Sequence, residues 1–145
     1  MKTRHFLNAV DHDKIVAAIS AAEERTSGEI RVFISRRNPR DVLKIANRWF
    51  KKLKMDQTPD RNGVLIFVAP RVHKFAVVGD SGIHAKCGEA FWIQVVEMMQ
   101  SHFKSEKYTD ALVSGIGRLG KMLAEHFPIA SGARINHLPD SVVEE

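Results

Sequence analysis

Two short loops carry the oxygen-bearing side chains with which this chain could do chemistry. The first contains Asp60 and Asn62, and the second contains Asp80 and Ser81. Carboxylate, amide and hydroxyl oxygens are the donors that hard divalent cations prefer in proteins. The four residues are therefore candidate ligands for Ca²⁺ or Mg²⁺, and oxygen donors favour these ions over zinc.

The segment between the loops predicts how they meet. An apolar run at residues 64–69 leads to a turn at 70–71, and a second apolar run follows at 75–78. The strands of a hairpin run in opposite directions, so the start of one and the end of the other lie at the same end. The two loops are therefore predicted to cross. The near-continuous apolar character indicates strands buried on both faces.

A structural interpretation of the same residues remains open. Asp60 and Asn62 are typical turn residues, and Asp80 is suited to the N-cap of a following helix. Glu29, at the start of an earlier predicted strand, is a candidate for a further carboxylate.

Composition predicts one soluble domain. The chain has 145 residues, of which 44% are hydrophobic and 27% are charged, as in ordinary globular proteins. The basic start has no apolar run of a secretory signal behind it, and no stretch approaches the roughly 20 apolar residues that span a bilayer. Cys87 is the only cysteine, which excludes an internal disulfide and a four-thiolate zinc site. We predict a reducing, cytoplasmic location.

The net charge of +5 is concentrated in one segment. Between Arg36 and Lys54 the only acid is Asp41, and a helix over Arg40–Lys54 would place a basic stripe opposite an apolar one. A solvated helix face explains this pattern, and so does attraction to an acidic protein, a nucleic acid or an anionic membrane surface. No aromatic residue interrupts the basic stripe, so base stacking is not predicted.

The order of elements predicts the fold. Helices are expected at residues 11–25, 40–54, 89–104 and 108–127, with Pro39 at the start of the second. Residues 29–36 alternate polar and apolar, which indicates a strand with one buried face. We predict an α/β fold, an αβα sandwich with a small mixed sheet of about four strands, as a single domain over residues 1–128. The tail at 129–145 is either an edge strand around 133–138 or disordered.

The order of three segments resembles the TPM domain family. They read TSGEIRV at 26–32, RNGVLIFVA at 61–69 and FAVVGDSGI at 75–83, and a helical segment follows near Phe91 and Trp92. The resemblance covers residues 10–128. This family includes thylakoid-lumen proteins linked to photosystem repair and many bacterial proteins. The resemblance implies an αβα sandwich and crossing loops near a divalent-metal site, and some plant relatives are credited with acid phosphatase activity.

The chain departs from the family pattern in two ways. Many relatives carry a signal peptide and a membrane anchor, whereas this chain is expected to be a stand-alone version. Many relatives also place an acidic residue after the glycine loop, where this chain has Ile83, His84, Ala85 and Lys86. We expect His84 to be the weaker substitute ligand.

These observations lead to three functional hypotheses. The first is a divalent-cation-binding module that interacts with or regulates an unidentified protein partner. The second is a metal-assisted phosphomonoesterase, with Asp80 as base or ligand and Arg61 or Arg71 as charge stabiliser. The third is an electrostatic binder that uses the basic helix.

Two further motifs are given structural interpretations. Residues 115–120 match G-x-G-x-x-G, but a dinucleotide site needs a strand before this motif, and here the glycines lie within a helical pattern. We expect them to permit close helix packing. His84 and Cys87 lack a third catalytic partner, and Cys87 is expected to be a packed core side chain.

Overall fold

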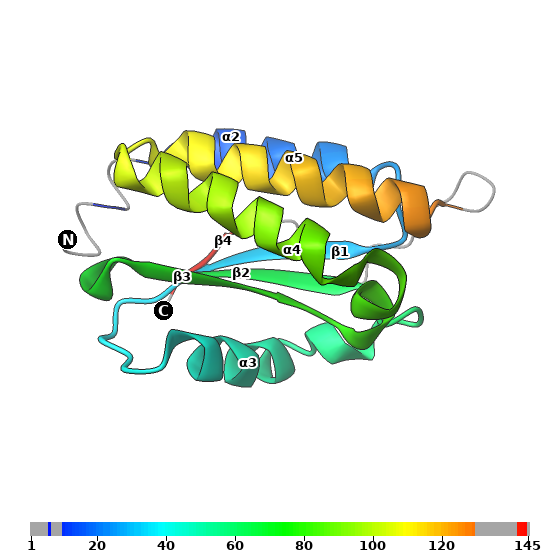
Figure 1. Cartoon of the computed structure of the whole chain (residues 1–145), viewed down its shortest axis with the longest axis horizontal. Helices are drawn as coiled ribbons and strands as arrows, with labels where there is room; N and C mark the ends of the chain where they lie inside the picture. Colours follow the sequence, from blue (N-terminus) through cyan, green and yellow to red (C-terminus); the bar gives the residue numbers. More distant parts are fainter. Residues whose placement is uncertain (1–5, 7–9, 130–141, 145) are drawn as a thin grey trace.

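The molecule is a three-layered αβα sandwich. The computed structural model describes residues 6, 10–129 and 142–144. Figure 1 shows three helices, α2 (His12–Glu23), α4 (Ser81–Lys104) and α5 (Tyr108–His126), on one face of the central sheet. Helix α3 (Val42–Lys52) lies on the opposite face. The predicted fold class is confirmed.

The sheet is mixed and has the strand order β3-β2-β1-β4. Strand β1 (Glu29–Ile34) pairs in parallel with β2 (Gly63–Ala69) and with β4 (Val142–Glu144). Strand β3 (Lys74–Gly79) returns antiparallel to β2 after the short 3-10 helix η2 (Pro70–Val72). The predicted hairpin is therefore confirmed. The first residues of β1 and β2 lie at the same end of the sheet as the last residues of β3.

The prediction that β1 buries only one face is wrong. All six residues of β1 are buried, including Glu29 and Arg31. Strand β1 lies in the sheet interior between β2 and β4, and helices cover both faces of the sheet. Burial lowers the pKa of Arg31, an effect opposed by the nearby Glu29 and Glu23. The alternating polar residues of β1 therefore do not face solvent, because β1 is a central strand that is covered on both faces.

Aspartate residues begin α2, α3 and α4. Asp11, Asp41 and Asp80 are the N-caps of α2, α3 and α4, and each side chain accepts a hydrogen bond from a main-chain N–H of the first turn. Helix α3 therefore starts after Asp41, and the expectation that Pro39 begins it is wrong. Helix α4 starts eight residues earlier than the predicted residue 89, and it is interrupted at Gly88, which has a φ of 74°.

The core has two parts, one on each side of the sheet. The larger lies between the sheet and the three-helix layer, and the smaller lies under α3, where Val42, Ala46 and Phe50 are buried as the apolar stripe predicted. The G-x-G-x-x-G motif lies within α5, as predicted. An added Cβ at Gly115 would lie 2.5 Å from Met99 Sδ, and one at Gly120 would lie 2.5 Å from Ala22 Cβ. These glycines permit close helix packing.

The C-terminal tail lies only partly within the described residues. The expected edge strand around residues 133–138 lies outside the described residues. A short edge strand does occur later, at β4, and pairs with β1. Within the described parts of the chain, no helix combines the length and apolarity required to cross a membrane.

Candidate functional site

The two predicted loops cross at one end of the sheet. Asp80 N donates a hydrogen bond to Gly63 O at 3.0 Å, and Gly82 N donates to Arg61 O at 3.0 Å. These main-chain bonds fix the loop after β3 directly against the loop before β2. The site that they frame is called the crossing loops here and comprises residues 58–63 and 79–82.

Gly82 allows the two loops to approach each other closely. A Cβ at this position would lie 2.7 Å from Arg61 O and still nearer to Asp60 O. Both are main-chain atoms, so a side chain cannot be accommodated by a rotamer change. The glycine is therefore required for the two loops to touch.

Asp80 is the most constrained carboxylate of the site. Its residue is 7% exposed, and Oδ1 accepts from Ser81 N at 2.7 Å as the helix cap. Arg61 donates from Nε to Oδ2 at 3.0 Å and from Nη2 to Oδ1 at 3.2 Å. The hydrogen bond and the charge of Asp80 raise the pKa of Arg61. The Arg61 side chain is 54% exposed, so the pair lies at the protein surface with one side open to water.

A second set of side chains links the loop before β1 to the crossing loops. Asn62 Nδ2 donates to Ser27 Oγ at 3.0 Å, and Ser27 Oγ donates to Asp60 Oδ2 at 3.2 Å. Asn62 is 1% exposed, and no described residue donates a hydrogen bond to its Oδ1. The site thus contains a buried oxygen acceptor whose bonding capacity is unused by the described chain.

Thr26 anchors the loop that carries Ser27 to the end of α5. Its buried hydroxyl donates to the carbonyl oxygens of Leu123 and Phe127 at the end of α5, and it accepts from Gly28 N at 3.0 Å. Ser27 N donates to Phe127 O at 3.0 Å. The loop before β1 is therefore tied to the helix layer.

The predicted ligands do not all occupy equivalent positions. Asp60 and Ser81 are exposed, whereas Asn62 and Asp80 are buried. Glu29 is fully buried within β1, and its N–H donates to Asn62 O at 3.4 Å. In residues 6, 10–129 and 142–144, no group of three or more His, Cys, Asp or Glu side chains is arranged to hold a metal ion. A cation here would depend on two aspartates together with amide, main-chain and water oxygens.

His84 lies in the first turns of α4 and is exposed. Its ring centroid lies 5.4 Å from that of Trp92, which follows the interruption of α4 at Gly88. Sequence reasoning missed the roles of Ser27 and of Arg61 as the partner of Asp80. The turn-forming TSG triplet before β1 was the available signal for Ser27.

Comparison with known proteins agrees with this architecture. A family model described as the TPM domain matches residues 1–122. The chain belongs to the TPM domain family. No curated protein matches this TPM domain.

A solved structure supports the same assignment. This TPM domain is similar to the BA42 protein from the psychrophilic bacterium Bizionia argentinensis, whose structure was determined by NMR. The two chains are 38% identical, 92% of each is covered, and the TM-score is 0.85. The similarity therefore extends over most of both chains.

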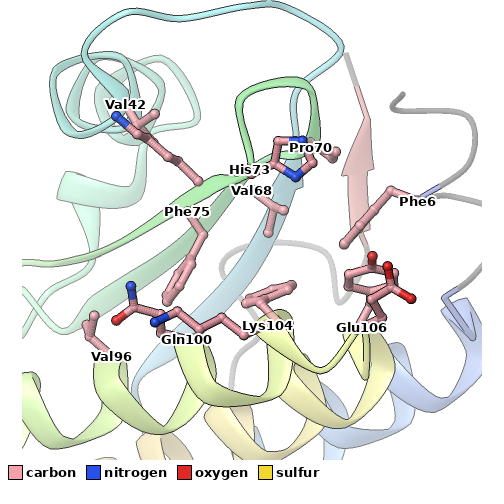
Figure 2. Close-up of a pocket in the computed structure, with 13 residues that line it drawn as sticks. Phe6, Val42, Val68, Pro70, His73, Phe75, Val96, Gln100, Lys104 and Glu106 are labelled. Carbon is pink, nitrogen blue, oxygen red and sulfur yellow. The ribbon is translucent and has the colours of Figure 1, made fainter. Parts of the chain in front are cut away.

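This TPM domain also has a cavity of about 830 Å³ with a mainly apolar lining at the opposite end of the sheet. Figure 2 shows Phe75 and Val68 from the sheet facing Val96 and Gln100 of α4, with Phe6 closing one side. None of the lining residues belongs to the crossing loops. The cavity and the candidate cation site are thus separate features.

Cys87 has the structural role that the sequence predicted. Its Sγ lies 2.9 Å from Met122 Sδ, and the residue is half-buried between α4 and α5. Burial raises the pKa of the thiol, an effect that outweighs the nearby Lys86. The protonated, unreactive form is therefore favoured.

Proposed function

We propose that this TPM domain binds Ca²⁺ or Mg²⁺ at the crossing loops and acts as a cation-responsive interaction module. The observation that carries the proposal is the unused acceptor of Asn62. Leaving a buried polar atom without a partner costs about 1–3 kcal/mol, so such an atom calls for a water or an ion. Here it belongs to an amide whose other end is fixed by Ser27, which also contacts Asp60.

The residues present suit a hard cation. Asp60, Asn62 and Asp80 supply carboxylate and amide oxygens, and the exposed Ser81 adds a hydroxyl. Bound Ca²⁺ or Mg²⁺ would supply concentrated positive charge that neutralises the carboxylates and crosslinks the two loops. With two carboxylates only, we expect a dissociation constant on the order of 10⁻⁵ to 10⁻³ M.

Arg61 gives the site a competing positive charge. In the structure described here its guanidinium neutralises Asp80. An incoming cation would need Asp80, so Arg61 would turn outward into the water to which it is already half exposed. Cation binding and the position of Arg61 are therefore coupled in this proposal. A protein partner would distinguish the cation-bound form by the outward position of the Arg61 side chain.

The first test is calorimetric titration of the chelator-stripped protein with Ca²⁺ and then Mg²⁺, accompanied by thermal melts. We expect saturable binding and a melting temperature that rises with free cation, because the ion binds the folded loops preferentially. Asp60→Ala should weaken binding at least tenfold. Asp110→Ala is the matched control, since Asp110 is also an exposed aspartate but lies on α5.

Asp80 needs a different control because it also caps α4. Asp41→Ala removes an equivalent cap from α3, where the carboxylate accepts from Lys44 N at 3.1 Å. Asp80→Ala should lose both stability and cation binding, whereas Asp41→Ala should lose stability only. Equal cation affinities in Asp80→Ala and Asp41→Ala would reject the proposal, and so would the absence of saturable cation binding by the wild-type chain. The loop residues would then have turn and cap roles only.

The phosphatase alternative can be decided with the same material. The family model that matches this chain carries the word phosphatase in its name, which justifies an assay with an aryl phosphate. Turnover that requires the cation and is lost in Asp60→Ala would make the module an enzyme. Cation binding without turnover would retain the interaction module and reject the enzyme.

A further inference from the structure

A strongly basic hollow of about 590 Å³ lies beside α3. Helix α3 covers the face of the sheet opposite the three-helix layer (Figure 1). Five cationic residues from two segments line the hollow, and they are Arg37, Arg40, Lys44, Arg48 and Lys52. The first two come from the loop after β1, and the other three follow one another at four-residue intervals along α3. Sequence analysis predicted the stripe, but only the fold shows that the preceding loop closes it into a concave site.

Positive charge exceeds negative charge in the lining of this basic hollow. Its one acidic lining residue, Asp41, uses its carboxylate to cap α3. Among the described residues, no carboxylate forms an ion pair with Arg40, Lys44 or Arg48. Like charges gathered around a concave surface focus the field and attract anions.

One wall of the basic hollow is held in place by aromatic packing. The Trp49 ring lies 4.4 Å from that of Phe33, measured between centroids, and Lys52 Nζ lies 4.9 Å from the Trp49 ring. The cation–π contact positions the ammonium at the rim of the hollow. Because Phe33 and Lys52 both pack against this indole, Trp49 is a poor platform for stacking a nucleic-acid base.

The spacing of the charges indicates the ligand class. Four residues of an α-helix rise about 6 Å, so Lys44, Arg48 and Lys52 spread positive charge over about 12 Å. A single phosphate cannot contact that length, whereas a chain of linked phosphoryl groups presents anionic oxygens along it. Arginine guanidinium groups also match phosphate oxygens with paired hydrogen bonds.

We propose that the basic hollow binds a compact polyphosphate, as the free inorganic chain or as the phosphate chain of a nucleotide. A membrane surface fits the site less well, because the apolar face of α3 is buried against the sheet and cannot enter lipid. No residue of the crossing loops lines the hollow. The proposal is therefore independent of the cation site.

The test is calorimetric titration with tripolyphosphate, ATP, AMP and inorganic phosphate, in low salt with chelator present so that the cation site is empty. Tripolyphosphate and ATP should bind at least tenfold more tightly than AMP or inorganic phosphate. Arg48→Ala and Lys44→Ala should each weaken tripolyphosphate binding about tenfold. Tighter binding of ATP than of tripolyphosphate would assign a nucleotide, and equal affinities would assign the phosphate chain alone.

Lys51 provides the matched control. It is an exposed cation on the same helix but does not line the basic hollow, so Lys51→Ala changes net charge equally. This variant should lose less than twofold in affinity. Equal losses in Lys51→Ala and Arg48→Ala would overturn the proposal, because they indicate a diffuse charge effect. Tighter binding of single-stranded DNA or phosphatidylserine vesicles, with the same residue dependence, would also overturn it.

Discussion

Arg61 donates two hydrogen bonds to Asp80, from Nε to Oδ2 at 3.0 Å and from Nη2 to Oδ1 at 3.2 Å. The two residues are 19 positions apart in sequence, and they meet only because the loops cross. Arg61 also has a φ of 52°, in the left-handed region that non-glycine residues seldom adopt. This pair links the architecture of the crossing loops to the proposed cation site.

Removing Arg61 is expected to favour the cation. In Arg61→Gln, Asp80 loses its competing positive charge, so Ca²⁺ no longer has to displace a guanidinium. We expect the dissociation constant for Ca²⁺ to fall severalfold in calorimetric titration. Arg71→Gln is the control, since Arg71 lies on η2 at the other end of the hairpin. A weaker affinity in Arg61→Gln would mean that Arg61 supports the site and does not compete with the cation.

Gly82 and Gly117 should respond in opposite directions to alanine. Gly82→Ala places a methyl group against main-chain oxygens of Asp60 and Arg61, so it should destabilise the fold by about 1–3 kcal/mol and weaken cation binding. At Gly117 an added Cβ meets nothing within 4 Å, and alanine should stabilise α5 by up to about 1 kcal/mol. Urea denaturation measures both. Unchanged stability of Gly82→Ala would show that the crossing can open without cost.

The Thr26 hydroxyl should be needed for stability at the start of β1. Thr26→Val keeps the shape but removes the donor to Leu123 O and the acceptor of Gly28 N, at a cost of about 1–3 kcal/mol. Thr26→Ser retains the hydroxyl and should lose about 1 kcal/mol or less, from the missing methyl group. Chemical denaturation would compare the two. Equal stabilities would show that the hydrogen bonds are not what holds this loop.

The raised pKa of Cys87 predicts its reactivity with pH. Burial disfavours the thiolate, which is the form that reacts with iodoacetamide. The alkylation rate of the folded protein should therefore reach half its maximum at a higher pH than that of N-acetylcysteine amide, a thiol without a neighbouring carboxylate. A half-maximal pH at or below that of the reference thiol would contradict the burial argument. Mass spectrometry of quenched samples gives the rates.

Part of the candidate site was predictable because it depends on local order along the chain. The hairpin between residues 63 and 79 is encoded by two apolar runs and a proline turn, and antiparallel pairing forces its ends together. Asp60, Asn62 and Asp80 could therefore be placed at one end of the sheet without a structure. The cap role of Asp80 was also visible, since an aspartate followed by a helical pattern is a local signal.

Other features depended on neighbours distant in sequence. The polar residues Glu29 and Arg31 suggested an exposed face, but β2 and β4 on either side make β1 a central strand. The start of α4 was missed because glycines at 82 and 88 weaken the helical pattern, whereas in the fold Gly82 is needed for contact with the other loop.

The sequence by itself determined the layered α/β architecture, the hairpin, the basic helix and the identity of the oxygen donors, because these follow from hydrophobic periodicity and turn chemistry. Only the tertiary structure decided which of these oxygens already have hydrogen-bond partners within the protein. It pairs Asp80 with Arg61, leaves Asn62 Oδ1 without a partner among the described residues, and joins Arg37 and Arg40 to the stripe on α3. Burial and hydrogen-bond partners are set by segments that meet across the fold, and a linear pattern does not contain that information.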